Sequence, residues 1–207
     1  MATYRSANDW RAACCDGDMV MTPHPDEVIA PAWTIRPEQP IDIDQIHELH
    51  RAAFTGSTEA ELVDAIRSGP DFLPDLSLVA VTADDSVLGH VLVSRIALQP
   101  DDETEARVDI LALAPLAVLP PHQGRGIATA LMREALAVAD QREEPMTIVL
   151  GSPSFYEPFG FLPAMPFEIH GPYDGAADAF QLRPRTGLDP TDLPTGTAVY
   201  PAMFSVV

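Results

Sequence analysis

An apolar run that ends in a glycine loop and continues as a helical pattern constrains this chain more than any other feature. Residues 108–119 are almost entirely apolar, as expected of a strand buried on both faces at the centre of a sheet. The loop reads Pro-His-Gln-Gly-Arg-Gly-Ile-Ala over residues 121–128, and apolar residues then recur at helical spacing up to Val138. Because the first turn of a helix has N–H groups without partners in the helix, this junction predicts an anion site.

The two best-known nucleotide-binding loops do not fit this junction. A P-loop ends in Gly-Lys-Ser or Gly-Lys-Thr, and a dinucleotide-binding loop reads Gly-x-Gly-x-x-Gly. Here Gly126 is followed by Ile127 and Ala128. The order Gln-x-x-Gly-x-Ala, from Gln123 to Ala128, resembles instead the acetyl-coenzyme A (acetyl-CoA) loop of the GNAT acetyltransferases.

In the GNAT family this loop holds the pyrophosphate of coenzyme A (CoA), and the pantetheine arm pairs with the backbone of the preceding strand. The resemblance therefore implies a set of cofactor-binding residues on the strand, the loop and the helix start. These are Leu116, Ala117, Val118, Gln123, Gly124, Arg125, Gly126, Ile127, Ala128 and Thr129.

Pro115 lies in the middle of the apolar run and lacks the N–H that a central strand donates to its neighbour. Proline inside a sheet is tolerated mainly at edges and bulges, so a bulge is expected here. Such a bulge would splay the strand from its neighbour, and GNAT domains have a splay at this point that admits the pantetheine arm. The alternative is that the strand simply ends at Pro115.

The remaining patterns predict strands and helices in an order that is similar to the GNAT core from about Ile35 to Leu162. Strands are expected at residues 33–37, 76–81, 87–98, 146–150, 179–182 and 198–200, and helices at 43–54, 62–66 and 127–138. The resemblance implies an α/β fold, the acyl-CoA N-acyltransferase fold, with a mixed twisted sheet flanked by helices and splayed central strands. We expect residues 1–32 to form an irregular or disordered extension and residues 33–207 to form a single GNAT domain.

A second motif follows the strand at 146–150. Ser152 and Pro153 suit the start of a short helix, and Gly160 can end it. The sequence Tyr-x-x-Phe-Gly-Phe that starts at Tyr156 resembles the GNAT segment whose tyrosine lies beside the thioester sulfur. The resemblance implies that Tyr156 is the general acid that protonates the leaving thiolate, with a backbone N–H near Val118 or Leu119 as the oxyanion donor. The alternative is that Tyr156 only packs against the cofactor.

The sequence does not identify the general base. Some GNAT enzymes carry a glutamate on the central strand, but here the only acidic residue of that strand is Asp109, near its start. His90 lies in the preceding hairpin strand, on the same face as Ser94. Because an unperturbed histidine has a pKa of about 6.5, His90 is the catalytic candidate, with a structural role as the alternative.

Charge and cysteine content limit the partners. The net charge of −19, from 31 acidic and 12 basic residues, argues against nucleic acid and against anionic membranes. The same charge could attract a cationic amine, or only keep the protein soluble. Cys14 and Cys15 are the only cysteines and are adjacent, which predicts no disulfide, no metal site and a cytoplasmic location. The longest apolar stretch, residues 110–119, is about half the length that spans a bilayer.

Together these features are typical of a GNAT N-acetyltransferase of the bacterial small-molecule branch. We expect it to move the acetyl group of acetyl-CoA to a primary amine. Direct attack in a ternary complex is expected, since no cysteine lies near the motifs to carry the acyl group. Acylation of a protein lysine or N-terminus, and an inactive acyl-CoA sensor, remain as alternatives. Family members are often dimers, so a homodimer is expected from the resemblance.

Overall fold

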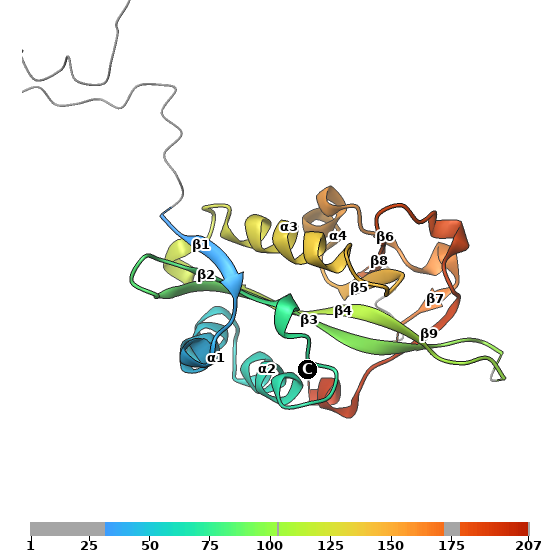
Figure 1. Cartoon of the computed structure of the whole chain (residues 1–207), viewed down its shortest axis with the longest axis horizontal. Helices are drawn as coiled ribbons and strands as arrows, with labels where there is room; N and C mark the ends of the chain where they lie inside the picture. The colour runs from blue at the N-terminus through green and yellow to red at the C-terminus, as the bar shows by residue number, and fades with distance from the viewer. Residues whose placement is uncertain (1–31, 103, 172–178, 207) are drawn as a thin grey trace, which may run out of the picture. The chain divides into compact units, whose positions relative to one another are not determined.

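A mixed β-sheet runs through the described part of the chain, with helices on both of its faces (Figure 1). The computed structural model describes residues 32–102, 104–171 and 179–206. The strands of the sheet are β1 (Thr34–Pro37), β2 (Ser77–Val81), β3 (Val87–Gln99), β4 (Val108–Val118), β5 (Met146–Leu150), β6 (Leu162–Pro163), β7 (Ile169–His170), β8 (Phe180–Pro184) and β9 (Gly196–Val199).

The strand order along the sheet is β1-β2-β3-β4-β5-β8-β6, and β4 and β5 at its centre are parallel. The long strand β3 pairs with β4 along one edge, and its other edge is shared by two partners. Its first half pairs with β2, while Ala97–Gln99 pair with β9. The turn between β2 and β3 contains Asp85 in the left-handed region, at φ 60°, which aspartate tolerates better than most residues.

Two helices cover each side of the sheet (Figure 1). The helices α1 (Ile43–Ala53) and α2 (Thr58–Arg67) lie on one face, and α3 (Ile127–Ala139) and the short α4 (Pro153–Tyr156) lie on the other. Alternation along β3 divides the core accordingly, because successive side chains point to opposite faces. Leu92 and Ile96 belong to the core under α1 and α2, whereas Val91 and Val93 belong to the core under α3.

The predicted bulge at Pro115 is confirmed. Val91 pairs with Leu116, but Val93 pairs with Leu113, so β4 has one more residue than β3 in this interval. The strand does not end at Pro115, since β4 continues to Val118. Its pairing with β5 is limited to two positions, residues 111 and 112, so β4 and β5 are splayed beyond that point.

The strands and helices expected from the sequence are all present, with ends shifted by a few residues. Not predicted were β7, the pairing of β9 with β3, and a C-terminal 3₁₀ helix (Ala202–Val206) that packs beside α2. Residues 1–31 of the predicted N-terminal extension are outside the described residues, so the prediction for them is not tested. Within the described ranges, each helix is too short or too polar to cross a bilayer.

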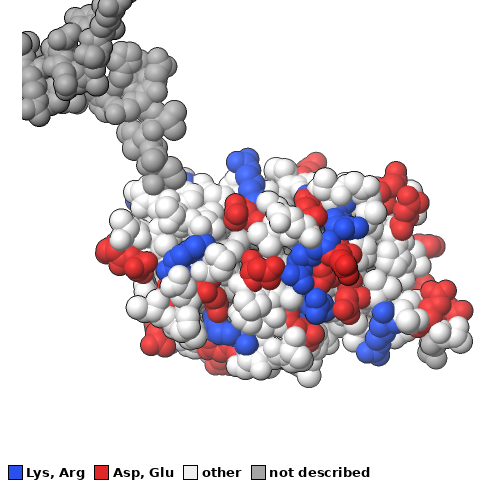
Figure 2. Space-filling model, in the orientation of Figure 1, with Lys and Arg blue, Asp and Glu red and all other residues white. Residues whose placement is uncertain are grey.

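Ion pairs engage most of the arginines near the surface. Figure 2 shows acidic and basic side chains interspersed on one face of the molecule. Arg183 binds Asp140 through two hydrogen bonds of 2.8 Å, and Arg95 and Arg142 both bind Glu144. These contacts fasten the segment after α3 to β8 and β3.

Candidate active site

A cavity of about 480 Å³ lies between the start of α3, the splayed end of β4 and α4. Every predicted cofactor-binding residue except Arg125 lines it. The lining residues are Leu116, Ala117, Val118, His122, Gln123, Gly124, Gly126, Ile127, Ala128, Thr129, Gly151, Ser152, Phe155 and Tyr156. Arg125 is exposed and does not line this cavity. We call this space the loop cavity.

The backbone of the glycine loop is suited to an anion. Gly124 and Gly126 have φ angles of 71° and 81°, in the left-handed region that favours glycine. Gly126 is the residue that precedes α3, and no side chain caps the free N–H groups of the first turn. Gln123 donates from Nε2 to the carbonyl of Val118 at 3.0 Å, which ties the loop to β4.

Among the described residues no lysine or arginine lines the loop cavity. Attraction for an anion would therefore come from the N–H groups of residues 127–129 and from the positive end of the helix dipole. His122 is the one histidine among the described residues that line this cavity, and it comes shortly before Arg125 in the sequence. An anion at this loop would therefore contact backbone N–H groups and not a cluster of charged side chains.

Tyr156 lies at the end of α4 and is held by contacts with other rings. Its ring centroid lies 4.9 Å from that of Phe155 and 5.5 Å from that of Phe161. Burial raises the pKa of the Tyr156 hydroxyl to about 12. The hydroxyl is therefore protonated at every pH at which an amine acetyltransferase would work.

A second cavity, of about 290 Å³, lies around the bulge in β4 and extends to α1, α2 and the C-terminal 3₁₀ helix. Its lining residues are Phe54, Glu59, Leu62, Leu113, Ala114, Pro115, Leu116, Val149, Leu150, Tyr156, Tyr200 and Phe204. We call this space the second cavity. Leu116 and Tyr156 line both cavities, so the two spaces meet where β4 and β5 part.

The structure narrows the choice of oxyanion donor. The N–H of Leu119 donates to the carbonyl of Leu88 at 2.9 Å, so of the two candidate donors Leu119 is already engaged within the protein. Successive N–H groups of a strand point to opposite edges. The N–H of Val118 therefore points away from β3 and towards the gap beside β5, where it is available to a ligand.

His90 lies outside both cavities. Its side chain is fully buried under α1, with Nδ1 2.9 Å from Nε2 of His50 and Nε2 2.9 Å from Oγ of Ser77. Ser77 donates to Glu38 at 2.6 Å, so its oxygen must accept from Nε2–H of His90. His90 Nδ1 then accepts from His50, and the chain of donors runs from His50 through His90 and Ser77 to Glu38.

This assignment agrees with two further observations. It leaves Nδ1 of His50 as a bare acceptor, and that buried nitrogen has no hydrogen-bond partner. Burial lowers the pKa of His50 to about 3 and lowers that of His90, so both rings are neutral at pH 7. A catalytic role for His90 stays a prediction, but its surroundings support the structural alternative better.

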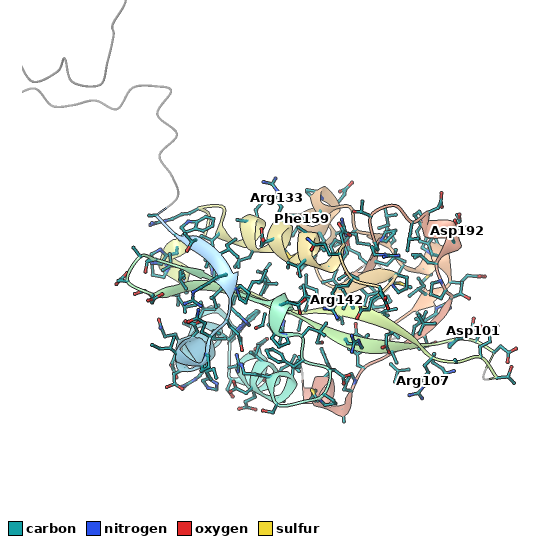
Figure 3. All side chains as sticks on the ribbon, in the orientation of Figure 1. Asp101, Arg107, Arg133, Arg142, Phe159 and Asp192 are labelled. Atoms are coloured by element: carbon teal, nitrogen blue, oxygen red, sulfur yellow. The ribbon has the colours of Figure 1, made fainter. Side chains whose placement is uncertain are left out.

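Asp109 also lies apart from the two cavities. It is exposed near the start of β4, 3.4 Å from Arg95, and it lines a separate polar groove together with Arg142. Figure 3 places Asp101 and Arg107 at the tip of the hairpin that β3 and β4 form, at the end of the sheet opposite α1. Asp109 therefore lies near one end of β4, and the bulge at Pro115 lies near the other.

Several lining residues were not predicted as site residues. They are His122, Gly151, Ser152 and Phe155 in the loop cavity, and Phe54, Glu59, Tyr200 and Phe204 in the second cavity. The residues of the loop cavity lie next to the glycine loop or the Tyr156 motif in the sequence, and this proximity could have identified them. Those of the second cavity come from α1, α2 and the C-terminal segment, and no local pattern links these segments.

Comparison of the sequence with models of protein families agrees with the fold and the cavities. Residues 34–164 match the model of the acetyltransferase (GNAT) domain. The chain belongs to the GNAT family of N-acetyltransferases. The match covers the sheet from β1 to β6 and the helices α1 to α4, which include the glycine loop and Tyr156.

Bacterial GNAT proteins resemble this chain over most of its length. It is 32% identical to YhbS, an uncharacterized N-acetyltransferase of Escherichia coli strain K12, over 171 residues that make up 83% of this chain and 98% of the relative. The crystal structure of E. coli YhbS with CoA superimposes with a TM-score of 0.76 and 30% identity, covering 85% of this chain and 93% of that one. The crystal structure of a GNAT acetyltransferase of Brucella melitensis with acetyl-CoA superimposes with a TM-score of 0.65 and 31% identity. The superposition covers 83% of this chain and 97% of that one.

Proposed function

We propose that this GNAT protein binds acetyl-CoA in the loop cavity and transfers the acetyl group to a small primary amine in the second cavity. The observation that carries the proposal is the meeting of the two cavities at Leu116 and Tyr156. The complexes of E. coli YhbS with CoA and of the B. melitensis protein with acetyl-CoA support the choice of donor.

In this proposal the pyrophosphate of acetyl-CoA binds the N–H groups of residues 127–129. The pantetheine arm follows β4 along Leu116, Ala117 and Val118, in the gap that the bulge opens. The thioester then lies beside Tyr156, with its carbonyl oxygen near the N–H of Val118.

The chemistry requires one bond to form and one to break. The neutral amine attacks the thioester carbonyl, the C–S bond breaks, and the thiolate takes the proton of the Tyr156 hydroxyl. Tyr156 afterwards regains a proton from the acetylated nitrogen, directly or through water. None of the residues lining either cavity is a cysteine, which favours direct transfer over an acylated enzyme. The absence of a metal from the reaction stays a prediction.

The experiment is a CoA-release assay over amines, amino acids and peptides, with the acetylated product identified by mass spectrometry. The chain contains no lysine, so acetylation of its own side-chain amines cannot account for CoA release. The proposal expects an acetylated small amine. Acetylated peptides alone would favour a protein acyltransferase, and CoA binding without any product would favour a sensor.

A further inference from the structure

Among the described residues, one carboxylate lines the second cavity. Glu59 lies in the first turn of α2, is half-buried, and lines this cavity. The other lining residues are aliphatic or aromatic, apart from the hydroxyls of Tyr156 and Tyr200. No arginine, lysine or histidine of the described residues lines it.

Glu59 has no partner within the described protein. It makes neither a hydrogen bond nor an ion pair there, although the neighbouring acidic side chains on α2 do. Ser57 donates to Glu61 at 2.7 Å, and Arg67 donates to Asp64 at 2.6 Å. Glu59 is thus a carboxylate in a mainly apolar cavity whose charge no described residue compensates, and such a group favours a cationic ligand.

Rings and aliphatic side chains form the rest of the wall. Phe54 directly follows α1 and Leu62 lies in α2. Phe204 packs edge to face against Tyr200, with ring centroids 5.0 Å apart. Leu113 and Leu116 line the side formed by β4. Such a wall binds an apolar body of limited size, since the cavity of about 290 Å³ is at the small end of ligand sites.

We propose that Glu59 selects the acceptor, and that the acceptor is a cationic primary amine with an apolar body and no carboxylate of its own. This inference rests on the proposed function, because it names the substrate class of the same site. The ammonium group pairs with Glu59 when the amine enters, and the apolar body contacts the rings. The ammonium group then loses one proton to solvent, and the neutral amine attacks the thioester. A carboxylate on the amine would meet Glu59 with no cation to compensate it, and like charges in contact exclude a ligand strongly.

The net charge of the chain acts in the same direction. At −19 the protein attracts a cationic amine before it reaches the cavity. Free amino acids carry a carboxylate and would be poor acceptors, whereas arylalkylamines would be good ones.

Three matched acceptors separate these cases: phenethylamine, L-phenylalaninamide and L-phenylalanine, which share the ring and the amine and differ at one carbon. We expect kcat/KM for phenethylamine to exceed that for L-phenylalanine by about 100-fold or more, with the amide closer to phenethylamine. Glu59→Gln keeps the shape and removes the charge. It should raise KM for phenethylamine by about tenfold or more and reduce the ratio between the two acceptors to below about tenfold.

Glu61→Gln is the control, because Glu61 is an exposed acidic residue of the same helix that lies outside the cavity. It should leave the ratio unchanged. A wild-type protein that uses L-phenylalanine as well as phenethylamine, or a Glu59→Gln variant with the wild-type ratio, would overturn the inference.

A binding measurement distinguishes failure of this inference from failure of the proposed function. Calorimetric titration of the CoA-bound protein with the same three amines should show the same order of affinity, and the same loss in Glu59→Gln. If none of the amines is acetylated, the proposed function fails, and the order of affinities still decides whether Glu59 selects a cationic amine. Equal or absent binding of all three amines to the CoA complex would overturn the inference.

Discussion

The ring of Tyr156 occupies the space in which a side chain at Gly151 would lie. A Cβ atom added at Gly151 would overlap Cε2 of the ring and would lie 3.2 Å from Cδ2. Gly151 follows β5, at the edge of the gap beside β4, so the lack of a side chain there lets the ring reach the junction of the two cavities.

This contact predicts the effect of Gly151→Ala. The added methyl group would push the Tyr156 ring away from the junction, and a displacement of about 1 Å can cost up to about 100-fold in rate. We therefore expect kcat to fall about 10- to 100-fold, with a much smaller change in thermal stability. Gly69→Ala is the control, because a Cβ at Gly69 would meet its neighbours at 3.4 Å, an ordinary contact distance. Wild-type turnover in Gly151→Ala would show that the ring position is not critical.

The glycine loop is tested by comparing two acetyl donors. Gly126→Ala places a side chain where φ is 81°, and the strain should shift the loop backbone. We expect KM for acetyl-CoA to rise about fivefold or more, while KM for S-acetylpantetheine, which lacks the pyrophosphate, stays within about twofold. Gly187→Ala carries similar strain, with φ at 93° and open space, in another loop, and should change neither KM. An equal rise for both donors would mean that the loop does not bind the pyrophosphate.

His90 is tested by separating stability from catalysis. His90→Gln breaks the buried chain of hydrogen bonds that links His50 to Ser77. Lost bonds of buried polar groups cost about 2 to 4 kcal/mol in total, so denaturant unfolding should show a loss of that size. At a temperature where the variant is folded, kcat and both KM values should stay within about threefold of wild type. A loss of kcat with unchanged stability would instead support the catalytic role expected from the sequence.

Glu38 gives the fold a dependence on acidic pH. Burial alone would raise its pKa, but contacts with His90, Arg67 and Ser77 outweigh burial and lower the pKa from 4.5 to about 2. Because the folded pKa is lowered, the stabilisation is complete above about pH 5 and is lost as pH falls from 4.5 towards 2. Its size is about 3 kcal/mol.

The check is the free energy of unfolding of Glu38→Gln and wild type across pH 3 to 7. The wild type should be the more stable above pH 5, and the difference should shrink steadily below pH 4.5. Glu48→Gln, at a largely exposed side chain on α1, should give no such trend. A difference between Glu38→Gln and wild type that stays constant across this range would contradict the assignment.

Local sequence patterns were enough to predict most of the fold. Pro115 indicated the bulge because proline lacks the N–H that a ladder needs, and the bulge lies there. The apolar pattern of residues 87–98 indicated a strand, and β3 contacts a core on each of its faces. The pairing of β9 with β3 was not predictable, since it joins segments about 100 residues apart and carries no local pattern.

The candidate site was predictable from the sequence only in part. The loop cavity is made mainly from one continuous motif, so its residues could be found by resemblance. The second cavity gathers Phe54, Glu59 and Phe204 from three separate segments, and only the tertiary structure brings them together. His90 was a candidate base because an unperturbed histidine has a pKa near neutrality. In the structure the ring is fully buried, which lowers its pKa, and it lines neither cavity.

The most direct test of the account is steady-state kinetics of Tyr156→Phe with acetyl-CoA and phenethylamine, together with calorimetric affinity for acetyl-CoA. Removal of the hydroxyl takes away the proposed proton donor but leaves the ring in place. Because general acid catalysis contributes about 100-fold or more, kcat should fall by at least that factor, while the Kd for acetyl-CoA stays within about twofold. Full turnover by Tyr156→Phe would contradict the claim that Tyr156 protonates the leaving thiolate at the junction of the two cavities.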